Sequence, residues 1–365
     1  MTHAYKQPAT PYMKIDAGRT RKNVQRLADY AKTHGIGIRP HTKTHKSLRA
    51  ARIQLDAGAI GLTVAKTGEA AVMSQVCDDV LMAYPAVDPP RCEALAKMNR
   101  STTVRVAIDS TTAADHLSDA AAVGGSTIGI LVDIDIGLHR TGVQTPETLV
   151  ALAQYVESKS NLRLDGIFCY PGHISGDEAT QKKMIQKSNA ITDAAIALFD
   201  AQGLNRQIVS GGSTPTAYYS HCFSGVTEIR SGTYVYNDMN GVLGDYCELD
   251  DCAARIHCTV VSDAVPGKVV LDAGSKTLTS DKYAPRPEAG HGHIIEYPNA
   301  VIKHLTEEHG EVDITQSDAS PKVGERVTVI PIHICVAVNM QNHIWWDEGD
   351  GQLEKIPVDT RGMLS

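Results

Sequence analysis

The sequence predicts a parallel β/α barrel of eight strands followed by a mainly antiparallel β domain. Between about residues 20 and 235, apolar strand patterns alternate with helical patterns of ten or more residues, which is typical of a parallel sheet. About eight such units in roughly 215 residues favour a closed barrel over an open sheet. After Gly232 the pattern changes to short strands separated by turn residues. We therefore expect a barrel over residues 15–235 and a β domain over residues 236–365 together with residues 1–14.

The barrel elements follow one another as helix and strand along the chain. The first helix, over residues 19–33, is predicted by apolar Val24, Leu27 and Ala28 at helical spacing, and further helices are expected over residues 47–58 and from residue 67. The expected barrel strands are Ile36–Arg39, Ile60–Val64, Val80–Tyr84, Val104–Asp109, Ile128–Asp135, Leu164–Tyr170 and Gln207–Ser210. The strands expected in the β domain are Cys258–Ser262, Lys268–Asp272, Glu325–Ile330, the segment Pro331–Asn339 and a strand through Trp345 and Trp346.

Composition excludes several classes of protein. A hydrophobic fraction of 42% and a charged fraction of 21% are typical of a globular protein. The net charge of -7 argues against nucleic acid as the main partner, because phosphate binding requires a basic excess. No apolar run approaches the roughly 20 residues of a membrane span, and residues 1–14 lack the apolar core of a signal peptide. Eight Cys without CxxC pairs indicate reduced thiols, so we expect a cytoplasmic protein.

The basic octapeptide Arg39–Lys46 is the most informative segment of the chain. It holds three Lys or Arg and two His directly after an apolar strand pattern. A lysine at the end of a buried strand and among other cations is favoured to lose its proton, and Schiff-base chemistry needs a neutral amine. A solvated basic turn is the alternative interpretation, since charge clusters usually form solvated faces.

Other polar groups follow the predicted barrel strands at the same end, where the active sites of such barrels lie. His139 and Arg140 follow one strand, and Tyr170 and His173 follow the next. The glycine- and hydroxyl-rich run Gly211–Thr216 follows a later strand and has the composition of a phosphate cradle. An amine, an arginine and a phosphate cradle on one rim predict a site for pyridoxal 5'-phosphate.

The predicted β domain contains a candidate metal site. His333 and Cys335 are two residues apart in an apolar segment that we expect to be a strand, where both side chains would point to one face. An imidazole and a thiolate suit Zn²⁺, although such a pair on a strand is more often ordinary packing. Two protein ligands leave coordination positions open, so a metal bound there would be catalytic rather than structural.

Taken together, these residues resemble the D-threonine aldolase and D-serine dehydratase family of pyridoxal phosphate enzymes, whose barrel is related to that of alanine racemase. The resemblance covers essentially the whole chain and rests on the order and spacing of six motifs. These motifs are Arg39–Lys46, Asp133–Gly142, Gly211–Thr216, Val226–Asp238, Glu307–Gly310 and Pro331–Cys335.

The resemblance implies a role for each candidate residue. Lys43, rather than Lys46, would bind the cofactor covalently, with Arg140 on its phenolic oxygen, Tyr170 near its ring and His41 beside Lys43. His173 is the only histidine on the loop where aldolases of the family carry their base. The divalent metal (Zn, Mn or Mg) would be bound by His333 and Cys335. The phosphate would be held by Gly212, Ser213, Thr214, Gly232 and Thr233.

The resemblance also implies the activity, which is that of a lyase on D-3-hydroxy-amino acids. We expect the aldolase reaction, in which the Cα–Cβ bond breaks to give glycine and an aldehyde, because the loop from Tyr170 to His173 is similar to that of aldolases. The alternative is dehydration of D-serine or D-threo-3-hydroxyaspartate to a keto acid and ammonia, because Cys335 stands where familiar aldolases have Asp. An amino-acid racemase and a non-catalytic cofactor carrier are less favoured. Enzymes of this fold are usually homodimers, which the resemblance implies here.

Overall fold

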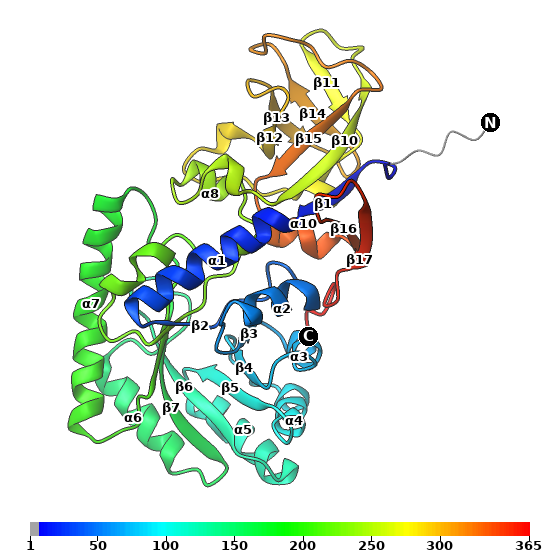
Figure 1. The fold of residues 1–365 in the computed structure, drawn as a ribbon. Helices are drawn as coiled ribbons and strands as arrows, with labels where there is room; N and C mark the ends of the chain where they lie inside the picture. The colour runs from blue at the N-terminus through cyan, green and yellow to red at the C-terminus, as the bar shows by residue number, and fades with distance from the viewer. Residues whose placement is uncertain (1–6) are drawn as a thin grey trace. The chain divides into compact units, whose positions relative to one another are not determined.

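A computed structural model describes residues 7–365, so residues 1–6 of the segment expected to join the β domain lie outside the described residues. The chain forms two compact units (Figure 1). The barrel unit comprises residues 24–43, 47–232 and 363–365. The β unit comprises the described part of residues 1–23 together with residues 44–46 and 233–362.

The barrel unit contains eight parallel strands in the order β2-β9-β8-β7-β6-β5-β4-β3, with helices packed around them (Figure 1). The two end strands meet through a parallel bridge between His41 and Thr63 and through the hydrogen bond from Ile60 N–H to Ile38 O, 2.9 Å long. The predicted parallel β/α barrel is thereby confirmed. Its strands are β2 (Gly37–Ile38), β3 (Leu62–Val64), β4 (Asp79–Met82), β5 (Thr103–Ile108), β6 (Ile128–Ile134), β7 (Leu162–Cys169), β8 (Ile208–Gly211) and β9 (Glu228–Ile229). Its helices are α1 (Ala17–His34, which begins in the β unit), α2 (Leu48–Asp56), α3 (Thr67–Met73), α4 (Pro89–Met98), α5 (Thr111–Gly124), α6 (Pro146–Glu157), α7 (Glu178–Ala201) and the 3-10 helix η1 (Ala217–Cys222).

Local sequence explains where several of these helices begin and end. The hydroxyl of Ser110 accepts the N–H of Ala113 at the start of α5, and the carboxylate of Asp177 accepts the N–H of Thr180 at the start of α7. Such caps satisfy backbone donors that the first helical turn leaves free. Gly125 ends α5 in the left-handed conformation (φ 62°), which glycine adopts without steric cost.

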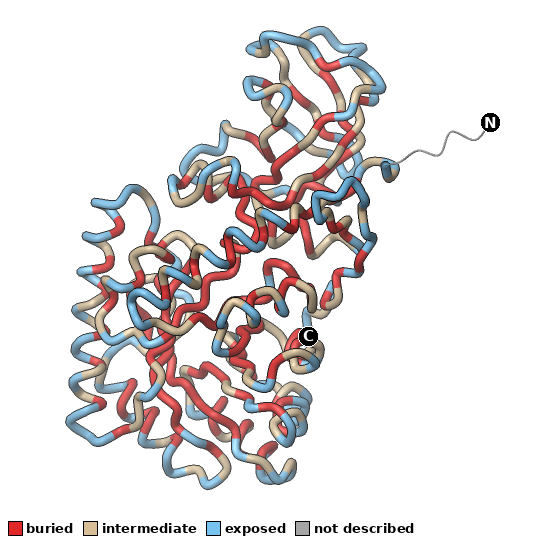
Figure 2. The backbone as a smooth tube through the Cα atoms, in the orientation of Figure 1, coloured by how far each residue is buried: buried red, intermediate tan, exposed pale blue. Residues whose placement is uncertain are grey.

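Apolar side chains fill both sides of the parallel sheet. Strand β6 is buried along its whole length, and buried residues follow the strands of the barrel unit (Figure 2). Side chains from these strands and from the surrounding helices form one large buried cluster. On the opposite face, Leu81, Ala107, Leu131 and Phe168 form a separate small cluster. Because alternate residues of a strand point to opposite faces, these four side chains form a layer inside the barrel.

A second layer inside the barrel is ionic and lies where the strands begin. Asp79 and Arg105 lie two residues before Leu81 and Ala107, respectively, so they point to the same interior face. Arg39 is bound to Glu228 (Nε to Oε2, 3.0 Å) and to Asp79 (Nη1 to Oδ1, 2.5 Å), and Arg105 contacts Asp79 and Asp165. The side chains of Arg39 and Glu228 are only 3% and 2% exposed. Ion pairs between buried charged side chains therefore fill the barrel interior where the strands begin.

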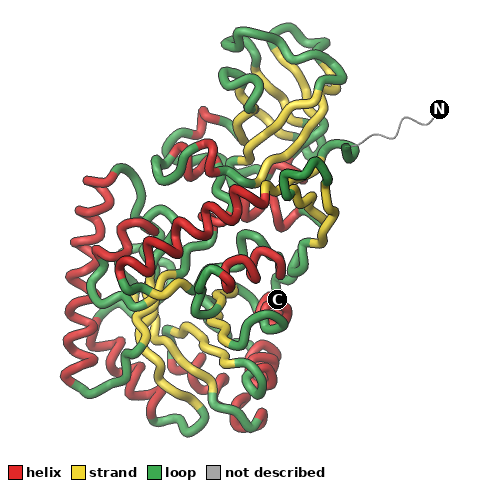
Figure 3. Tube along the Cα trace, in the orientation of Figure 1, coloured by secondary structure: helices red, strands yellow, loops and turns green. Residues whose placement is uncertain are grey.

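The β unit consists mainly of strands and loops (Figure 3), and most of its strand pairs are antiparallel. Six of them close on themselves in the order β11-β14-β13-β12-β15-β10, and β1, β16 and β17 continue from β10. Strand β1 pairs antiparallel with β10 and parallel with β16. The strands are β1 (Tyr12–Asp16), β10 (Ala254–Ser262), β11 (Lys268–Leu271), β12 (Gly292–Ile294), β13 (Val301–Leu305), β14 (Gly310–Asp313), β15 (Arg326–Pro331), β16 (His343–Asp347) and β17 (Leu353–Pro357). Its helices are α8 (Met239–Leu243), α9 (Ser275–Leu278), α10 (Ile334–Met340) and the 3-10 helices η2 (Thr233–Val235), η3 (Leu249–Asp251) and η4 (Pro287–Ala289).

The structure corrects one predicted element and adds several strands that were not predicted, namely β1, β12, β13, β14 and β17 of the β unit and β9 of the barrel unit. The segment Pro331–Asn339, expected to be a strand, ends β15 at Pro331 and then forms helix α10, with His333 as its N-cap. Among residues 7–365, none of the helices has the length and apolar character needed to span a membrane.

Candidate active site

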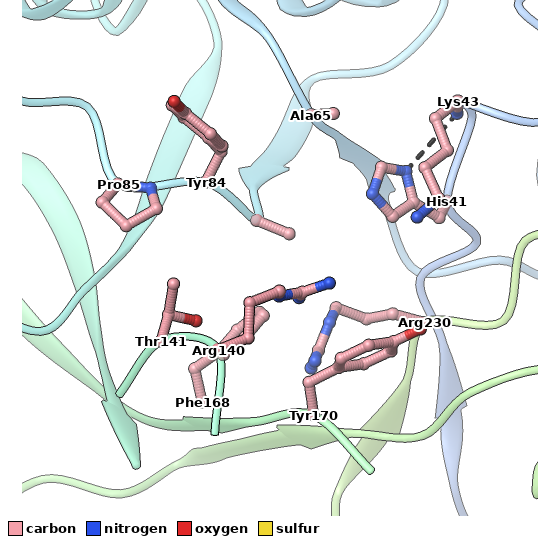
Figure 4. A pocket seen from close by; sticks show the side chains of 11 residues that line it. His41, Lys43, Ala65, Tyr84, Pro85, Arg140, Thr141, Phe168, Tyr170 and Arg230 are labelled. Carbon is pink, nitrogen blue, oxygen red and sulfur yellow. Dashed lines mark hydrogen bonds between the residues drawn. The ribbon is translucent and has the colours of Figure 1, made fainter. Parts of the chain in front are cut away.

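Lys43 is the one exposed residue of the octapeptide that follows β2. Arg39, His41, Lys46 and the other four members are buried, so the octapeptide is not a solvated basic face. Backbone hydrogen bonds hold this segment in place, from His41 N–H to Ser231 O (3.0 Å) and from Thr42 N–H to Thr63 O (2.8 Å). The N–H of Lys43 donates to Nδ1 of His41 over 3.4 Å (Figure 4). The rigid segment thus presents a single amine.

Lys43 lies at a cavity of about 340 Å³ in the barrel unit. His41 and Lys43 lie on one side of it and Arg140, Tyr170 and Arg230 on the facing side (Figure 4). Cationic and aromatic side chains therefore dominate the walls, to which no carboxylate of the described part of the chain contributes. The complete lining is His41, Lys43, Ala65, Ala83, Tyr84, Pro85, Arg140, Thr141, Phe168, Tyr170 and Arg230.

Arg140 stands on a loop that strand-end aspartates hold in place. The carboxylate of Asp135 accepts the backbone N–H groups of Gly137 (2.9 Å) and His139 (3.0 Å) and contacts the His139 ring (2.7 Å). Burial alone would raise the pKa of Asp135, but these hydrogen bonds hold it below its usual value. The guanidinium carbon of Arg140 lies 4.7 Å from the centre of the Tyr170 ring, a cation–π distance. The loop thereby fixes a cation at the cavity.

The same loop requires glycine at position 142. Gly142 has φ 100°, and a Cβ added there would lie 2.5 Å from the backbone nitrogen of Asp135. We expect Gly142→Ala to displace Arg140 and to weaken cofactor binding at least tenfold, measured by titration of the apoprotein with pyridoxal phosphate. Gly125→Ala is the matched control, because Gly125 also has positive φ but meets no atom within 4 Å. Equal affinity in both variants would contradict this prediction.

Asp133 is a buried carboxyl beside this loop, and it predicts a pH dependence of stability. Burial raises the pKa of Asp133 to about 7. The hydrogen bond from the Thr141 hydroxyl (2.9 Å) and the nearby Arg230 act in the opposite direction and lower the pKa, but burial outweighs them. Because the folded pKa lies above the unfolded value, the group's contribution to stability is fully present below about pH 4 and is lost as the pH rises through 7.

We expect Asp133→Asn to remove this dependence. Relative to the wild type, the variant should gain up to about 4 kcal/mol of unfolding free energy between pH 4 and pH 8, which corresponds to a shift of roughly three pH units. Denaturant unfolding across this range measures the gain. Asp119→Asn, at an exposed carboxyl of α5, is the control and should follow the wild type. Parallel curves for Asp133→Asn and the wild type would refute the expectation.

Arg230 lines the cavity and was not among the predicted site residues. Its guanidinium donates to Ser210 Oγ (2.6 Å) and to Cys169 O (2.7 Å), and its carbon lies 3.6 Å from the centre of the Phe168 ring. Burial lowers the pKa of this guanidinium. The signal was available in the sequence, because Arg230 lies in the motif Val226–Asp238 two residues before Gly232. Tyr84, Thr141 and Phe168 were missed as well; Thr141 lies in the motif Asp133–Gly142, whereas no motif marks Tyr84 or Phe168.

Of the predicted phosphate residues, Gly212, Ser213, Thr214 and Gly232 lie on two joined loops of the barrel unit and do not line this cavity. The N–H of Gly232 donates to Thr214 Oγ1 (3.2 Å), which joins the loop after β8 to the loop after β9. The hydroxyls of Ser213 and Thr216 lie 2.9 Å apart. Gly212 has φ 80°, and a Cβ there would lie 2.8 Å from Cβ of Ile229. Thr233 belongs to the β unit, where its hydroxyl lies 3.7 Å from the Cys335 sulfur.

His173 lies outside the cavity lining, unlike its predicted loop partner Tyr170. Its ring covers Gly137, where an added Cβ would lie 2.9 Å from Nε2. Its Nδ1 is buried and has no hydrogen-bond partner among residues 7–365. Burial lowers the pKa of His173, which favours the neutral imidazole.

The β unit brings His333 and Cys335 together at the start of α10. Burial lowers the pKa of His333, but the side-chain hydrogen bond with Cys335 and the acidic groups of Asp238 and Asp281 outweigh it and raise the pKa to about 10. The Cys335 sulfur lies 3.2 Å from the hydroxyl of Thr44, the residue that follows Lys43 in the chain. Within the described residues, no group of three or more His, Cys, Asp or Glu is arranged to hold a metal. The candidate metal site therefore consists of two ligands.

Known proteins resemble the chain over nearly its whole length. Residues 15–240 match the family model of the alanine racemase N-terminal domain, and residues 253–346 match that of a putative serine dehydratase domain. The 3-hydroxy-D-aspartate aldolase of Paracoccus denitrificans (strain Pd 1222) is 30% identical over 376 residues, which cover 97% of this chain and 92% of that protein.

Solved structures agree with these matches. The D-threonine aldolase of Filomicrobium marinum has a TM-score of 0.91 at 28% identity, with 98% of this chain and 97% of that one covered. The D-threo-3-hydroxyaspartate dehydratase of Delftia sp. HT23 has a TM-score of 0.89 at 26% identity, with 96% and 97% covered. Structures of D-threo-3-hydroxyaspartate dehydratase also include a histidine-to-alanine variant and, two positions further on, a cysteine-to-alanine variant in a metal-free form. The chain therefore belongs to the alanine racemase-like family of pyridoxal phosphate-dependent lyases that includes the D-threonine aldolases, the 3-hydroxy-D-aspartate aldolases and the D-serine dehydratases.

Proposed function

We propose that this protein is a pyridoxal phosphate- and divalent metal-dependent aldolase that cleaves the Cα–Cβ bond of D-3-hydroxy-amino acids to glycine and an aldehyde. One observation carries the proposal more than any other: Lys43 alone of its buried octapeptide is exposed, and it lies at a cavity walled by Arg140, Arg230 and Tyr170. An amine among fixed cations suits a cofactor with an aldehyde and several anionic oxygens.

The residues of the barrel unit fit pyridoxal phosphate. Lys43 would bind its aldehyde carbon, Arg140 its phenolic oxygen, and Tyr170 and His41 would lie near the ring. The phosphate would be held by Gly212, Ser213, Thr214, Gly232 and Thr233, where backbone N–H groups and hydroxyls cluster after β8 and β9. When bound, the cofactor supplies an electron sink for the Cα bond that breaks.

The protein's own groups perform the remaining tasks. Arg140 and Arg230 keep positive charge at the cavity, which favours the carboxylate of an amino acid over a neutral or cationic ligand. Phe168 and Tyr170 form aromatic walls that exclude water from the reacting atoms. His173, neutral because of burial, is the candidate acceptor of the substrate hydroxyl proton, a role that requires its loop to move because the ring lies outside the cavity lining.

The chemistry of His333 and Cys335 fits a divalent metal. Imidazole nitrogen and thiolate are preferred ligands of Zn²⁺, and two protein ligands leave positions for water and for a substrate hydroxyl. Two variants of D-threo-3-hydroxyaspartate dehydratase support this assignment. One replaces a histidine and the other, in a metal-free form, replaces a cysteine two positions further on, which is the spacing of His333 and Cys335. A bound metal would act as a Lewis acid on the substrate hydroxyl.

Dehydration of D-serine or D-threo-3-hydroxyaspartate is the second candidate function. Cys335 favours it, since that dehydratase also carries a cysteine two positions after a histidine. In this reaction Lys43 would take the Cα proton and the metal would assist the departure of hydroxide. Racemisation gives the pair His333 and Cys335 no role and is not favoured.

Product analysis distinguishes the candidates. The purified protein, loaded with pyridoxal phosphate and Zn²⁺ or Mn²⁺, is incubated with D-threonine, D-serine or D-threo-3-hydroxyaspartate. Glycine with an aldehyde supports the aldolase, and a keto acid with ammonia supports the dehydratase. If none of these D-amino acids yields either product, the lyase proposal is wrong.

We further expect a homodimer in the cytoplasm. All eight cysteines are free thiols, as in a reducing compartment. Sedimentation of the purified protein tests the dimer, and fractionation of the source cells tests the compartment.

A further inference from the structure

Asp281 is an acidic residue of the β unit that no motif marked. It lies between α9 and β12, and its Oδ2 is 2.5 Å from Nδ1 of His333. A carboxylate only accepts hydrogen bonds, so Nδ1 of His333 must carry the proton. In the neutral imidazole the lone pair is then on Nε2, the other ring nitrogen.

The loop that carries Asp281 is itself held from both sides. The ring Nδ1 of the buried His291, on the segment before β12, donates to the carbonyl oxygen of Asp281 over 3.0 Å. The N–H of Asp281 donates to the hydroxyl of Thr279 over 3.2 Å. Thr279 has φ 75°, an uncommon conformation for a residue with a branched side chain. These contacts hold the backbone of Asp281 and so determine where its carboxylate lies.

The backbone of His333 is fixed independently of its ring. The buried carboxylate of Asp238 accepts the N–H of Ile334 through Oδ2 (2.9 Å) and the N–H of Gly241 through Oδ1 (3.2 Å). Asp238 therefore anchors the start of α10, whereas Asp281 is the acid that contacts the ring. Asp238 thus fixes the backbone next to His333, and Asp281 contacts its ring.

We propose that Asp281 is a positioning residue that orients the His333 ring and selects the tautomer in which Nε2 binds the metal. The inference rests on the proposed function, because it assumes that His333 and Cys335 bind a divalent metal. Carboxylates that hold the second nitrogen of a ligating histidine raise its basicity and fix its orientation, and their loss typically weakens metal binding about 10- to 100-fold. Asp281 is a partner of the ligand in this arrangement and not itself a ligand.

Metal affinity tests the proposal without reference to turnover. The full-length protein loaded with pyridoxal phosphate is titrated with Zn²⁺ against a chromophoric chelator. We expect Asp281→Ala to weaken Zn²⁺ binding about 10- to 100-fold. Asp281→Asn should recover most of this loss, because its amide oxygen still accepts the proton of Nδ1. Asp263→Asn changes the charge of an exposed site in the same unit and should bind like the wild type.

Cobalt substitution separates a positioning residue from a ligand. At saturation with Co²⁺, the d–d absorption of Asp281→Asn should match that of the wild type, because the ligands are unchanged. A changed spectrum would make Asp281 a ligand and overturn the proposal. So would unchanged affinity in both variants, or equal losses in both, since equal losses indicate charge alone. If the alanine variant does not fold, affinity of the asparagine variant within about threefold of the wild type, with an unchanged spectrum, is the supporting result, and a tenfold loss overturns it.

Failure of the proposed metal site would look different. In that case the wild type itself would bind neither Zn²⁺ nor Co²⁺ with a thiolate-to-metal absorption band. Loss of the inference alone leaves that band and the wild-type affinity in place.

Discussion

Replacing Lys43 by alanine is expected to abolish both covalent cofactor binding and activity. The change removes the one exposed amine of the octapeptide, and no other lysine of residues 7–365 lines the cavity. Without a covalent partner for the aldehyde, the yellow colour of the protein should be lost on desalting. In the wild type, borohydride reduction followed by peptide mapping should place the cofactor mass on the peptide that contains Lys43.

Lys46→Met is the control from the same segment. Lys46 is buried, and its ammonium donates to the carbonyl of Thr360 over 3.4 Å. Its amine is therefore engaged elsewhere and does not take the role assigned to Lys43. The variant should keep the colour and the labelled Lys43 peptide, provided that circular dichroism confirms its fold. Colour that survives in Lys43→Ala, or a label on another lysine, would remove Lys43 from the mechanism.

Loss of the metal pair is expected to reduce activity by a factor of at least about 100, while cofactor binding persists. A Lewis acid on the reacting oxygen contributes several kcal/mol, and roughly 3 kcal/mol corresponds to about two orders of magnitude in rate. The changes are His333→Ala and Cys335→Ala, or removal of metal with a chelator. Product formation and the cofactor absorbance are measured on the same samples.

Two controls accompany this experiment. Cys222→Ala removes a partly exposed thiol of the barrel unit and should leave activity unchanged. Activity of the chelated wild type should return when Zn²⁺ or Mn²⁺ is added back, whereas that of the variants should not. Full activity after chelation, particularly racemisation of an amino acid, would argue against a metal-dependent lyase.

The sequence predicted the barrel well because its signals are local. Apolar runs such as Ile128–Ile134 are buried along their whole length, and the turn residues around them mark their ends. Strand β9 was missed because Glu228 and Ile229 do not form an apolar run. Glu228 is buried beside Arg39, which lies 189 positions away in the chain, and its carboxylate also accepts the hydroxyl of Ser210. Single-sequence patterns carry no information about such partners.

The prediction of a strand through His333 and Cys335 failed for a related reason. Apolar residues at every second position from Ile332 to Val338 are typical of a strand. In the fold, however, Asp238 accepts the N–H of Ile334 and so caps a helix at this point. A contact between residues 96 positions apart outweighs the local preference. The two candidate ligands nevertheless come together, because the side chains of His333 and Cys335 form a hydrogen bond at the start of the helix.

The ion pairs inside the barrel, where its strands begin, constrain which substitutions this protein can accept during evolution. Substituting Arg39 alone would leave Glu228 buried without its ionic partner, at a cost of about 3–5 kcal/mol, and substituting Glu228 alone would leave Arg39 with only its second partner, Asp79. Replacing both by apolar residues of similar volume is often close to neutral. Each single step is therefore selected against although the combined change is tolerated. Related sequences should therefore keep both residues or replace both, so positions 39 and 228 should covary.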